Sequence, residues 1–303
     1  MGATTGWEYH PTQQLLGHQQ AMLEMLKVLA KACDAHGLQY YMIGGTMLGA
    51  IRHGGFIPWD NDMDIGLPRR DYEMLMQHAK DWLPKRYELV DGRTLERFHW
   101  AFARLIDRHT TSWERWHEWR VGGITIDVFP IDGVPAPGFK RWRHIKVYRL
   151  LTRLNYWANR YPFKHGYRPD GLLYWLLQQL IAGKTTQRWI HQWRQKVPFE
   201  SAQYASDFDK RGKFIDAKAT YGSPTPYIFA DTTLKGVEQP DEYLTTLYGD
   251  YMSIPEPENI EVHHCAYLDL NTPYREFLKQ HPGADNPEVR RNIAYPNESD
   301  NTR

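Results

Sequence analysis

One segment, from Gly44 to Gly66, limits the fold more than any other part of the chain, and it reads GGTMLGAIRHGGFIPWDNDMDIG. Its three aspartates, Asp60, Asp62 and Asp64, stand at every second position. Residues two apart on a strand point to the same side, about 6–7 Å apart, so a strand over DMDIGL places Asp62 and Asp64 side by side. Carboxylates that close repel each other and need a positive partner when they are buried.

The positive partner that this pattern favours is a divalent cation. Hard oxygen ligands suit Mg²⁺ or Mn²⁺, which keep several waters and take further oxygens from a substrate phosphate. A solvated acidic loop is the alternative, because Asp and Asn are also common in turns.

The residues around this segment favour the metal site. Gly44, Gly45 and Thr46 follow a short strand, YYMIG, and precede a helical turn over 46–52. Glycines there let backbone N–H groups approach a phosphate, and a helix N-terminus adds partial positive charge. A third carboxylate, Asp127, stands in the strand GITIDVFPID, where capping the strand end is its alternative role. A strand, a Gly-Gly turn, a helix and an Asp-x-Asp strand follow the order of a nucleotidyltransferase active site.

Periodicity divides the chain into four parts. We predict an α+β fold, in which a mixed β-sheet flanked by helices is followed by a largely helical C-terminal annex. Predicted helices cover 15–36, 71–83, 139–160 and 170–197, and predicted strands cover YELVD, WAFARLID and GITIDVFPID. The predicted parts are a flexible tail at 1–14, a catalytic core at 15–135, a helical and mixed annex at 136–281 and a disordered tail at 282–303.

Composition restricts the partners and the location. The net charge is +1, so no global field favours nucleic acid. Two cysteines are too few for a disulfide scaffold or a cysteine-ligated zinc site. Without a signal peptide or a long apolar run, the sequence predicts a cytoplasmic protein. The basic stretch 139–153 is either a solvated helix face or a peripheral contact with the inner face of the plasma membrane.

The segments GTMLGAIRHGGFIPWDNDMDIGL and IDVFPIDG closely resemble the LicD family of phosphotransferases, which includes fukutin and fukutin-related protein. The resemblance covers residues 20–135 and, more weakly, YGDYM at 248–252 and the histidine pair at 263–264. It implies a nucleotidyltransferase-like core that uses Mg²⁺ or Mn²⁺. The implied reaction moves a phospho-alcohol, such as phosphocholine or phosphoribitol, from a CDP-activated donor to a hydroxyl of a cell-surface or lipid-linked glycan.

The resemblance assigns the acidic pair of the family to Asp62 and Asp64 and its third carboxylate to Asp127. All three are therefore predicted catalytic residues and metal ligands. Transfer would be an in-line displacement at phosphorus with CMP leaving, so the site would act by positioning and charge neutralisation. Asp127 would complete the metal site or accept the proton of the acceptor hydroxyl.

Eight further residues are predicted to bind substrate or phosphate: Gly44, Gly45, Thr46, Arg52, His53, Trp59, His263 and His264. Arg52 would neutralise phosphate charge, and Trp59 would stack on a base or sugar. Arg52, His53 and Trp59 have structural alternatives, as a surface charge, a loop contact and a loop anchor. At most one of His263 and His264 can face a ligand, because adjacent residues on a strand point to opposite sides.

Two other classes of function remain open. One is a nucleotidyltransferase that transfers a cytidylyl group or modifies a small molecule, and the other is a nucleotide-binding protein without catalysis. Three carboxylates favour catalysis, because binding a nucleotide does not need them. The products separate the classes: a phosphotransferase releases CMP from a CDP-alcohol, a cytidylyltransferase releases pyrophosphate from CTP, and a binding protein releases nothing. The pattern assigns no role to Asp60 or Asp132.

Overall fold

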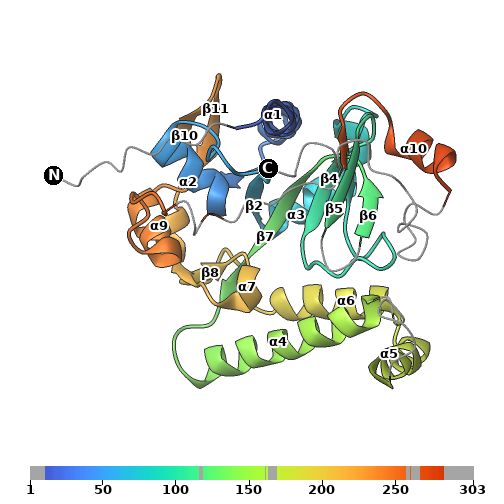
Figure 1. Ribbon diagram of the computed structural model, residues 1–303. Helices are drawn as coiled ribbons and strands as arrows, with labels where there is room; N and C mark the ends of the chain where they lie inside the picture. The colour runs from blue at the N-terminus through green and yellow to red at the C-terminus, as the bar shows by residue number, and fades with distance from the viewer. Residues whose placement is uncertain are drawn as a thin grey trace.

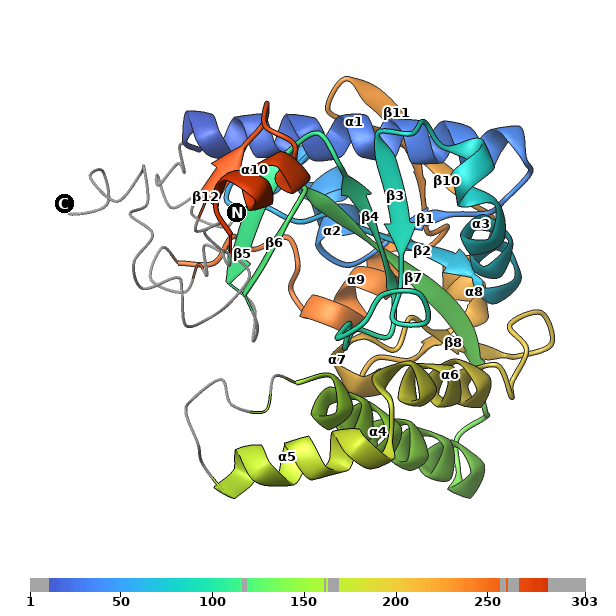
Figure 2. The same cartoon turned by 90° about the vertical axis from the view of Figure 1, so that its right-hand side faces the viewer.

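The computed structural model describes residues 11–115, 119–160, 162, 169–256, 260 and 267–282, and a large sheet forms its centre (Figures 1 and 2). The strands of this sheet are β1 (Tyr41–Met42), β2 (Asp64–Pro68), β3 (Tyr87–Val90), β4 (Ala103–Asp107), β7 (Thr125–Val134), β8 (Tyr204–Ser206), β9 (Asp216–Ala217), β10 (Thr225–Phe229) and β11 (Thr232–Gly236). They follow the order β10-β11-β1-β2-β7-β4-β3, with β8 on β7 and β9 on β8. The pairs β2–β7 and β1–β11 are parallel and the other pairs are antiparallel, which confirms the predicted α+β class.

The long first helix covers the sheet as predicted. Helix α1 (Gln13–Ala35) packs against β7 and β11. The hydroxyl of Thr12 caps it by accepting a hydrogen bond from the backbone N–H of Leu15 at 3.2 Å. Its buried apolar residues recur at helical spacing: Met22, Met25, Leu26, Leu29 and Cys33. Burial of this face is what fixes the helix on the sheet.

Four more helices complete this part of the fold. Helix α2 (Gly44–His53) follows β1 directly and contacts α9 (Pro240–Tyr248). Helix α3 (Arg69–Trp82) follows β2 directly and packs on β2, β3 and β7. The short helix α8 (Lys218–Tyr221) contacts α9. Helices α2 and α9, far apart in the sequence, therefore lie side by side next to the start of β2 (Figure 1).

Four helices from the first part of the predicted annex at 136–281 form a layer below the sheet, on the side opposite α1 (Figures 1 and 2). It consists of α4 (Phe139–Asn159), α5 (Pro169–Leu180), α6 (Gly183–Arg194) and α7 (Asp209–Gly212). The prediction of a single helix over 170–197 was wrong, because this stretch forms two helices, and the second begins at Gly183. A Cβ atom on Gly183 would lie 2.2 Å from Oδ1 of Asn159, so glycine is needed where α6 approaches α4.

A small second sheet was not predicted. It contains β5 (Thr111–Arg115), β6 (Trp119–Gly122) and β12 (Tyr267–Asp269), in the order β12-β5-β6. Trp113 and Val121 pair across β5 and β6 and are buried together with Phe277 of α10 (Tyr274–Gln280). The core of this sheet forms only when segments far apart in the sequence meet, so no single segment shows the pattern.

Several sequence boundaries differ from those of the structure. Strand β2 begins at Asp64, so Asp62 precedes the strand instead of standing on it. The large sheet includes strands on both sides of residue 135, the predicted end of the catalytic core, since β8 to β11 follow that position. Residues 13 and 14 belong to α1, while residues 1–10 and 283–303 of the two predicted tails lie outside the described residues. Within the described residues, no helix has the length and apolar character that crossing a bilayer requires.

Candidate active site

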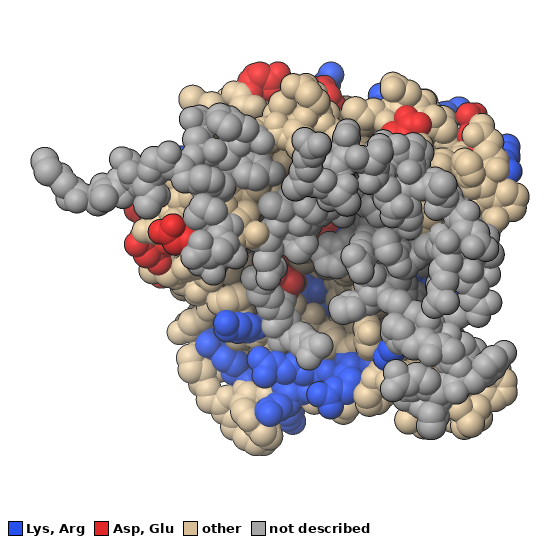
Figure 3. Space-filling model, in the orientation of Figure 1, with Lys and Arg blue, Asp and Glu red and all other residues tan. Residues whose placement is uncertain are grey.

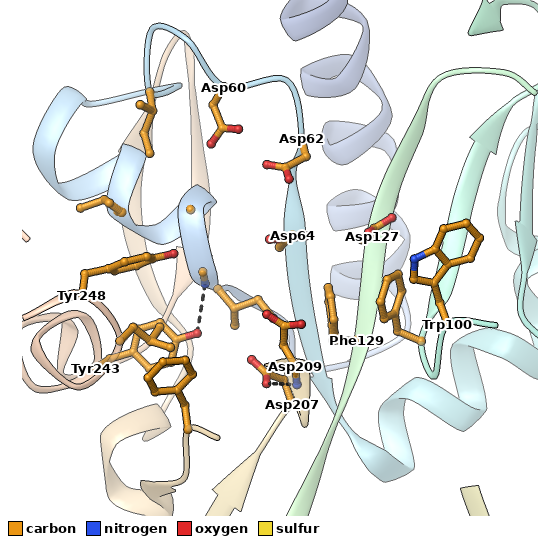
Figure 4. A pocket seen from close by; sticks show the side chains of 18 of the residues that line it. Asp60, Asp62, Asp64, Trp100, Asp127, Phe129, Asp207, Asp209, Tyr243 and Tyr248 are labelled. Carbon is orange, nitrogen blue, oxygen red and sulfur yellow. Dashed lines mark hydrogen bonds between the residues drawn. The ribbon is translucent and has the colours of Figure 1, made fainter. Parts of the chain in front are cut away.

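The three aspartates predicted to act together line one pocket of about 560 Å³ (Figure 4). Strands β2 and β7 are parallel, and Asp64 stands directly opposite Asp127 in their register. The backbone N–H of Asp127 donates a hydrogen bond to the carbonyl oxygen of Met63 at 2.9 Å, which ties the two strand starts together. Asp62 lines the same pocket from the residues just before β2. The parallel register therefore brings together carboxylates from two distant segments.

Glycine is required where α2 begins beside these carboxylates. The φ angle of Gly44 is +54°, which side chains rarely allow. A Cβ atom on Gly44 would lie 3.1 Å from Oδ2 of Asp64, and one on Gly45 would lie 3.1 Å from Oδ2 of Asp60. Both glycines line the pocket, and their binding of phosphate stays a prediction. The partial positive charge of the N-terminus of α2 thus lies beside the acidic side chains, where it supports an anion.

Thr46 fixes the backbone near the pocket and is not among the residues that line it. Its hydroxyl accepts a hydrogen bond from the backbone N–H of Asp64 at 2.7 Å, and its side chain is buried. The start of α2 has a second support, because the N–H of Gly44 donates to the hydroxyl of Tyr243 at 3.0 Å. Helix α9 therefore holds the start of α2 in place.

Arg52 and His53 lie at the other end of α2 and do not line the pocket. Nη1 of Arg52 donates to the carbonyl oxygens of Tyr251, at 2.9 Å, and Ser253, at 3.2 Å. Its Nε lies 3.0 Å from Nε2 of His53. Burial and the neighbouring charge of Arg52 lower the pKa of His53. In this structure Arg52 therefore fixes the position of the segment after α9, and His53 contacts Arg52. Phosphate binding by either residue stays a prediction.

Trp59 lines the pocket, and its ring meets the ring of His53 edge-on at 6.2 Å. Its stacking on a base or sugar stays a prediction. The predicted residues His263 and His264 lie outside the described residues.

Burial and neighbouring acidic side chains raise the pKa of Asp64 in the pocket. Desolvation raises the pKa of Asp64 well above its ordinary value of 3.8, and the charges of neighbouring aspartates raise it further: Asp62, Asp127, Asp209 and Asp60. Desolvation also raises the pKa of Asp60, although local hydrogen bonds oppose the shift. Without a cation, such a cluster favours protons on its carboxylates.

A guanidinium group accompanies Asp127. Nε of Arg104, on β4, lies 2.9 Å from Oδ1 of Asp127. The other side of this guanidinium carries the ring of Trp100, whose centroid lies 4.1 Å from Cζ. Both Asp127 and Trp100 line the pocket. Arg104 contacts both of them without lining the pocket, so it helps to orient these two side chains.

Asp132, to which the sequence assigned no role, has a structural one. It is fully buried and accepts hydrogen bonds from Nε and Nη2 of Arg69, at 2.7 and 2.6 Å, and from Nε of Arg194 at 2.6 Å. Burial alone would raise its pKa, but the charges of Arg69 and Arg194 outweigh burial and lower it. The carboxylate therefore joins β7 to α3 and α6.

Sequence reasoning missed a second acidic pair in the pocket, Asp207 and Asp209 (Figure 4). The backbone N–H of Asp209 donates to Oδ1 of Asp207 at 2.8 Å. Phe208 between them has a φ of 64°, a left-handed conformation that is uncommon for a residue with a side chain. The available signal was the spacing of SDFDK, which repeats the Asp-x-Asp pattern.

An aromatic wall also lines the pocket, and sequence reasoning missed all of it except Trp59. Its other members are Trp100, Phe102, Phe129, Phe214, Tyr243 and Tyr248. The rings of Phe102 and Phe129 lie 4.2 Å apart between centroids. Burial raises the pKa of the Tyr248 hydroxyl, and the charges of Asp64 and Asp60 raise it further. Tyr248 opens the YGDYM segment, so this segment reaches the pocket.

The donor atoms of the site fit a hard divalent cation. Carboxylate oxygens are the ligands that Mg²⁺ and Mn²⁺ prefer, and the repulsion among Asp62, Asp64 and their neighbours is what a cation would relieve. Among the residues that the structure describes, no three His, Cys, Asp or Glu side chains are grouped so that they could hold one metal ion. Two protein carboxylates can suffice, because Mg²⁺ keeps several waters and takes oxygens from phosphate.

A mixed sheet with carboxylates on neighbouring strands beside a glycine-rich helix start defines a nucleotidyltransferase-like protein. The sequence model of the LicD/FKTN/FKRP nucleotidyltransferase domain matches residues 37–149, which include both strands and α2. The sequence of residues 37–149 is therefore that of a LicD-family nucleotidyltransferase domain.

Curated relatives agree with this family. The chain is 27% identical over 266 residues to the lipopolysaccharide cholinephosphotransferase LicD of Haemophilus influenzae, across 82% of this chain and 96% of that protein. It is 40% identical over 52 residues to the human ribitol 5-phosphate transferase FKRP, across 17% of this chain and 10% of that protein. A match of 30% over 61 residues to the yeast mannosyltransferase regulator 4 covers 5% of that protein.

Proposed function

We propose that this chain is a metal-dependent phosphotransferase that moves a phospho-alcohol from a CDP-activated donor to a hydroxyl of a cell-surface glycan. The observation that carries the proposal is the register of Asp64 opposite Asp127, beside Asp62 and the start of α2, in one pocket. The names of two relatives support it, because each describes the transfer of an alcohol that carries phosphate, and one names a lipopolysaccharide. A cytoplasmic location is part of the proposal, and cell fractionation tests it.

Asp62 and Asp64 would hold Mg²⁺ or Mn²⁺, with Asp127 as a third ligand or as the proton acceptor. When bound, the cation would neutralise charge on the donor diphosphate and on the leaving phosphate. Gly44 and Gly45 carry no Cβ atom that would crowd the carboxylates of Asp64 and Asp60, and the N-terminus of α2 would attract a diphosphate oxygen.

The residues of the chain would position the displacement. The acceptor oxygen would form a bond to the phosphorus next to the alcohol, the bond from that phosphorus to CMP would break, and Asp127 would take the hydroxyl proton. Arg104 would keep the carboxylate of Asp127 in a fixed orientation through the contact at 2.9 Å. Trp59 would offer a flat surface for the cytosine or ribose.

The remaining wall of the pocket favours a cationic alcohol. Aromatic rings bind quaternary ammonium groups through their faces, and a nearby carboxylate adds attraction. Phe102 and Phe129 form adjoining rings in the pocket, and the second acidic pair, Asp207 and Asp209, lines it as well. Choline is therefore the alcohol that we expect, ahead of the uncharged ribitol or glycerol.

The experiment measures product release from each donor. The full-length protein is incubated with CDP-choline, CDP-ribitol or CDP-glycerol, with lipopolysaccharide or another glycan acceptor, and with Mg²⁺, Mn²⁺ or EDTA. We expect CMP, transfer of labelled alcohol to the glycan, and loss of both with EDTA. Pyrophosphate release from CTP would indicate a cytidylyltransferase, and donor binding without any product would indicate a binding protein. Either result would overturn the proposal.

A further inference from the structure

Helix α4 presents a basic stripe to solvent. Its exposed basic residues Arg143, Lys146, Arg149 and Arg153 recur every three or four positions, so they share one face of the helix. No Asp or Glu stands between Gly133 and Pro169. Figure 3 shows the basic side chains gathered in one patch over the α4 layer. A chain with a net charge of +1 therefore concentrates positive charge on one side.

Large apolar side chains lie in the same stripe. Phe139, Trp142 and Leu150 are 72%, 56% and 55% exposed, although residues of this kind are usually buried. The rings of Phe139 and Trp142 stack with centroids 5.6 Å apart. Nζ of Lys146 lies 5.9 Å from the centre of the Trp142 ring. Charged and apolar groups are thus interleaved instead of being sorted to opposite faces.

Helix α5 extends this surface with an apolar face. Its exposed large residues are Leu172, Leu173, Trp175, Leu176 and Leu180. No charged residue stands between Gly171 and Ile181. Gln178 joins α5 to α4, because its Nε2 donates to the carbonyl oxygens of Trp157, at 3.0 Å, and Arg160, at 2.6 Å. Both helices belong to the layer on the side of the molecule opposite α1 (Figures 1 and 2).

We infer that the outward faces of α4 and α5 form a docking surface for an anionic phospholipid membrane. Helices that lie in a membrane interface combine Lys and Arg, whose stems reach along apolar surface, with Trp, Phe and Leu that enter the acyl boundary. Anionic headgroups complement the basic stripe. A second copy of the chain complements it poorly, because a two-fold interface would place this positive stripe against itself.

The inner face of α4 supports the pocket. The hydroxyl of Tyr148 donates to the carbonyl oxygen of Phe208 at 3.1 Å, and the two rings meet at 4.7 Å. Phe208 stands between Asp207 and Asp209, which line the pocket. A helix is about 10 Å thick, so the docked membrane would lie about one helix diameter below this acidic pair. If the proposed function holds, this geometry suits an acceptor glycan built on a lipid.

Vesicle sedimentation tests the docking surface without any measure of activity. The full chain is mixed with vesicles of phosphatidylcholine, or of equal parts phosphatidylcholine and phosphatidylglycerol, and the pelleted fraction is measured. We expect binding to the anionic vesicles only. Arg143→Gln, Lys146→Gln and Arg149→Gln together should weaken it roughly a hundredfold, since each basic residue near a charged surface contributes about a fivefold change.

The matched control changes three exposed lysines elsewhere, Lys31→Gln, Lys80→Gln and Lys85→Gln, and should bind like the wild type. A second variant, with Leu173→Ser and Leu176→Ser, should also lose binding, because α5 contributes insertion. Circular dichroism verifies that each variant is folded. Equal loss in the lysine control, unchanged binding of both docking-surface variants, or a wild type that dimerises and ignores anionic vesicles would each overturn the inference.

Discussion

Arg104 and Asp127 stand directly opposite each other on β4 and β7, and Nε of Arg104 lies 2.9 Å from Oδ1 of Asp127. Asp127 therefore has a fixed positive partner on the neighbouring strand. This contact motivates the role that we propose for Asp127. Asp62 and Asp64 would act mainly on the cation, and Asp127 would act mainly on the acceptor hydroxyl.

Arg104→Gln should lower kcat with little change in the KM for the donor, because it removes the group that orients Asp127. Residues that orient a ligand or base typically contribute about 10–100-fold in activity. The control is Arg86→Gln, because Arg86 pairs with the buried Asp107 at 2.6 Å at the other end of β4. Steady-state kinetics on both variants decides the matter. Equal effects on kcat would reduce Arg104 to a structural role.

Asp127→Asn should reduce turnover by about 10²–10⁴-fold, the usual contribution of one proton acceptor. Donor affinity should stay near that of the wild type, since the interaction is made mainly in the transition state. Calorimetric titration with CDP-choline and Mg²⁺ measures the affinity. Donor binding lost as fully as in Asp62→Asn would make Asp127 chiefly a metal ligand, and unchanged turnover would remove it from the site.

Asp64→Asn should abolish transfer and, in the absence of metal, should raise the melting temperature at neutral pH. The folded-state pKa of Asp64 lies above 3.8, so the folded protein binds this proton more tightly than the unfolded chain. The resulting destabilisation grows as the pH rises above 3.8 towards the folded pKa and is absent at lower pH. Thermal melts at pH values from acidic to neutral should show that the difference in melting temperature between the variant and the wild type increases with pH.

Mn²⁺ should raise the melting temperature of the wild type, because a ligand of the folded state stabilises it, and should leave Asp64→Asn unchanged. An equal response of the two proteins to Mn²⁺ would contradict the proposed metal site.

Asp132→Asn should lower the free energy of unfolding by about 3–5 kcal/mol, the usual result of leaving a buried ion without its partner. Urea unfolding measures this value, with the exposed Asp81→Asn as the control. Because Arg69 and Arg194 lower the folded pKa of Asp132, its contribution is complete above the ordinary value of 3.8. It is lost as the pH falls through the lowered folded value. A variant as stable as Asp81→Asn would contradict this account.

Asp209→Asn should raise the KM for CDP-choline about tenfold and leave that for CDP-ribitol almost unchanged, since only choline carries a positive charge. Competition kinetics with both donors measures the difference. Equal losses with the two donors would assign Asp209 to catalysis or to the structure of the pocket instead.

The local pattern was enough to predict that three carboxylates meet in one place, because Asp62 and Asp64 stand two residues apart and Asp127 stands on an obvious strand. The register of the strands determines which other residues join these carboxylates. Arg104 became a partner of Asp127 only through the pairing of β4 with β7, which no single segment encodes. Arg52 shows the limit of closeness in sequence: it follows the glycines closely, yet eight residues along a helix separate it from Gly44 by about 12 Å, and its phosphate binding stays a prediction.

Strand β7 carries Asp127 near its start and Asp132 near its end, and α4 follows it. Domain grafting is constrained by this arrangement. A chimera that exchanges the annex between relatives has a natural junction between Val134 and Phe139, yet that junction would separate Asp132 from Arg194 of α6. The two parents must therefore match at this buried ion pair, even where the rest of their sequences differ.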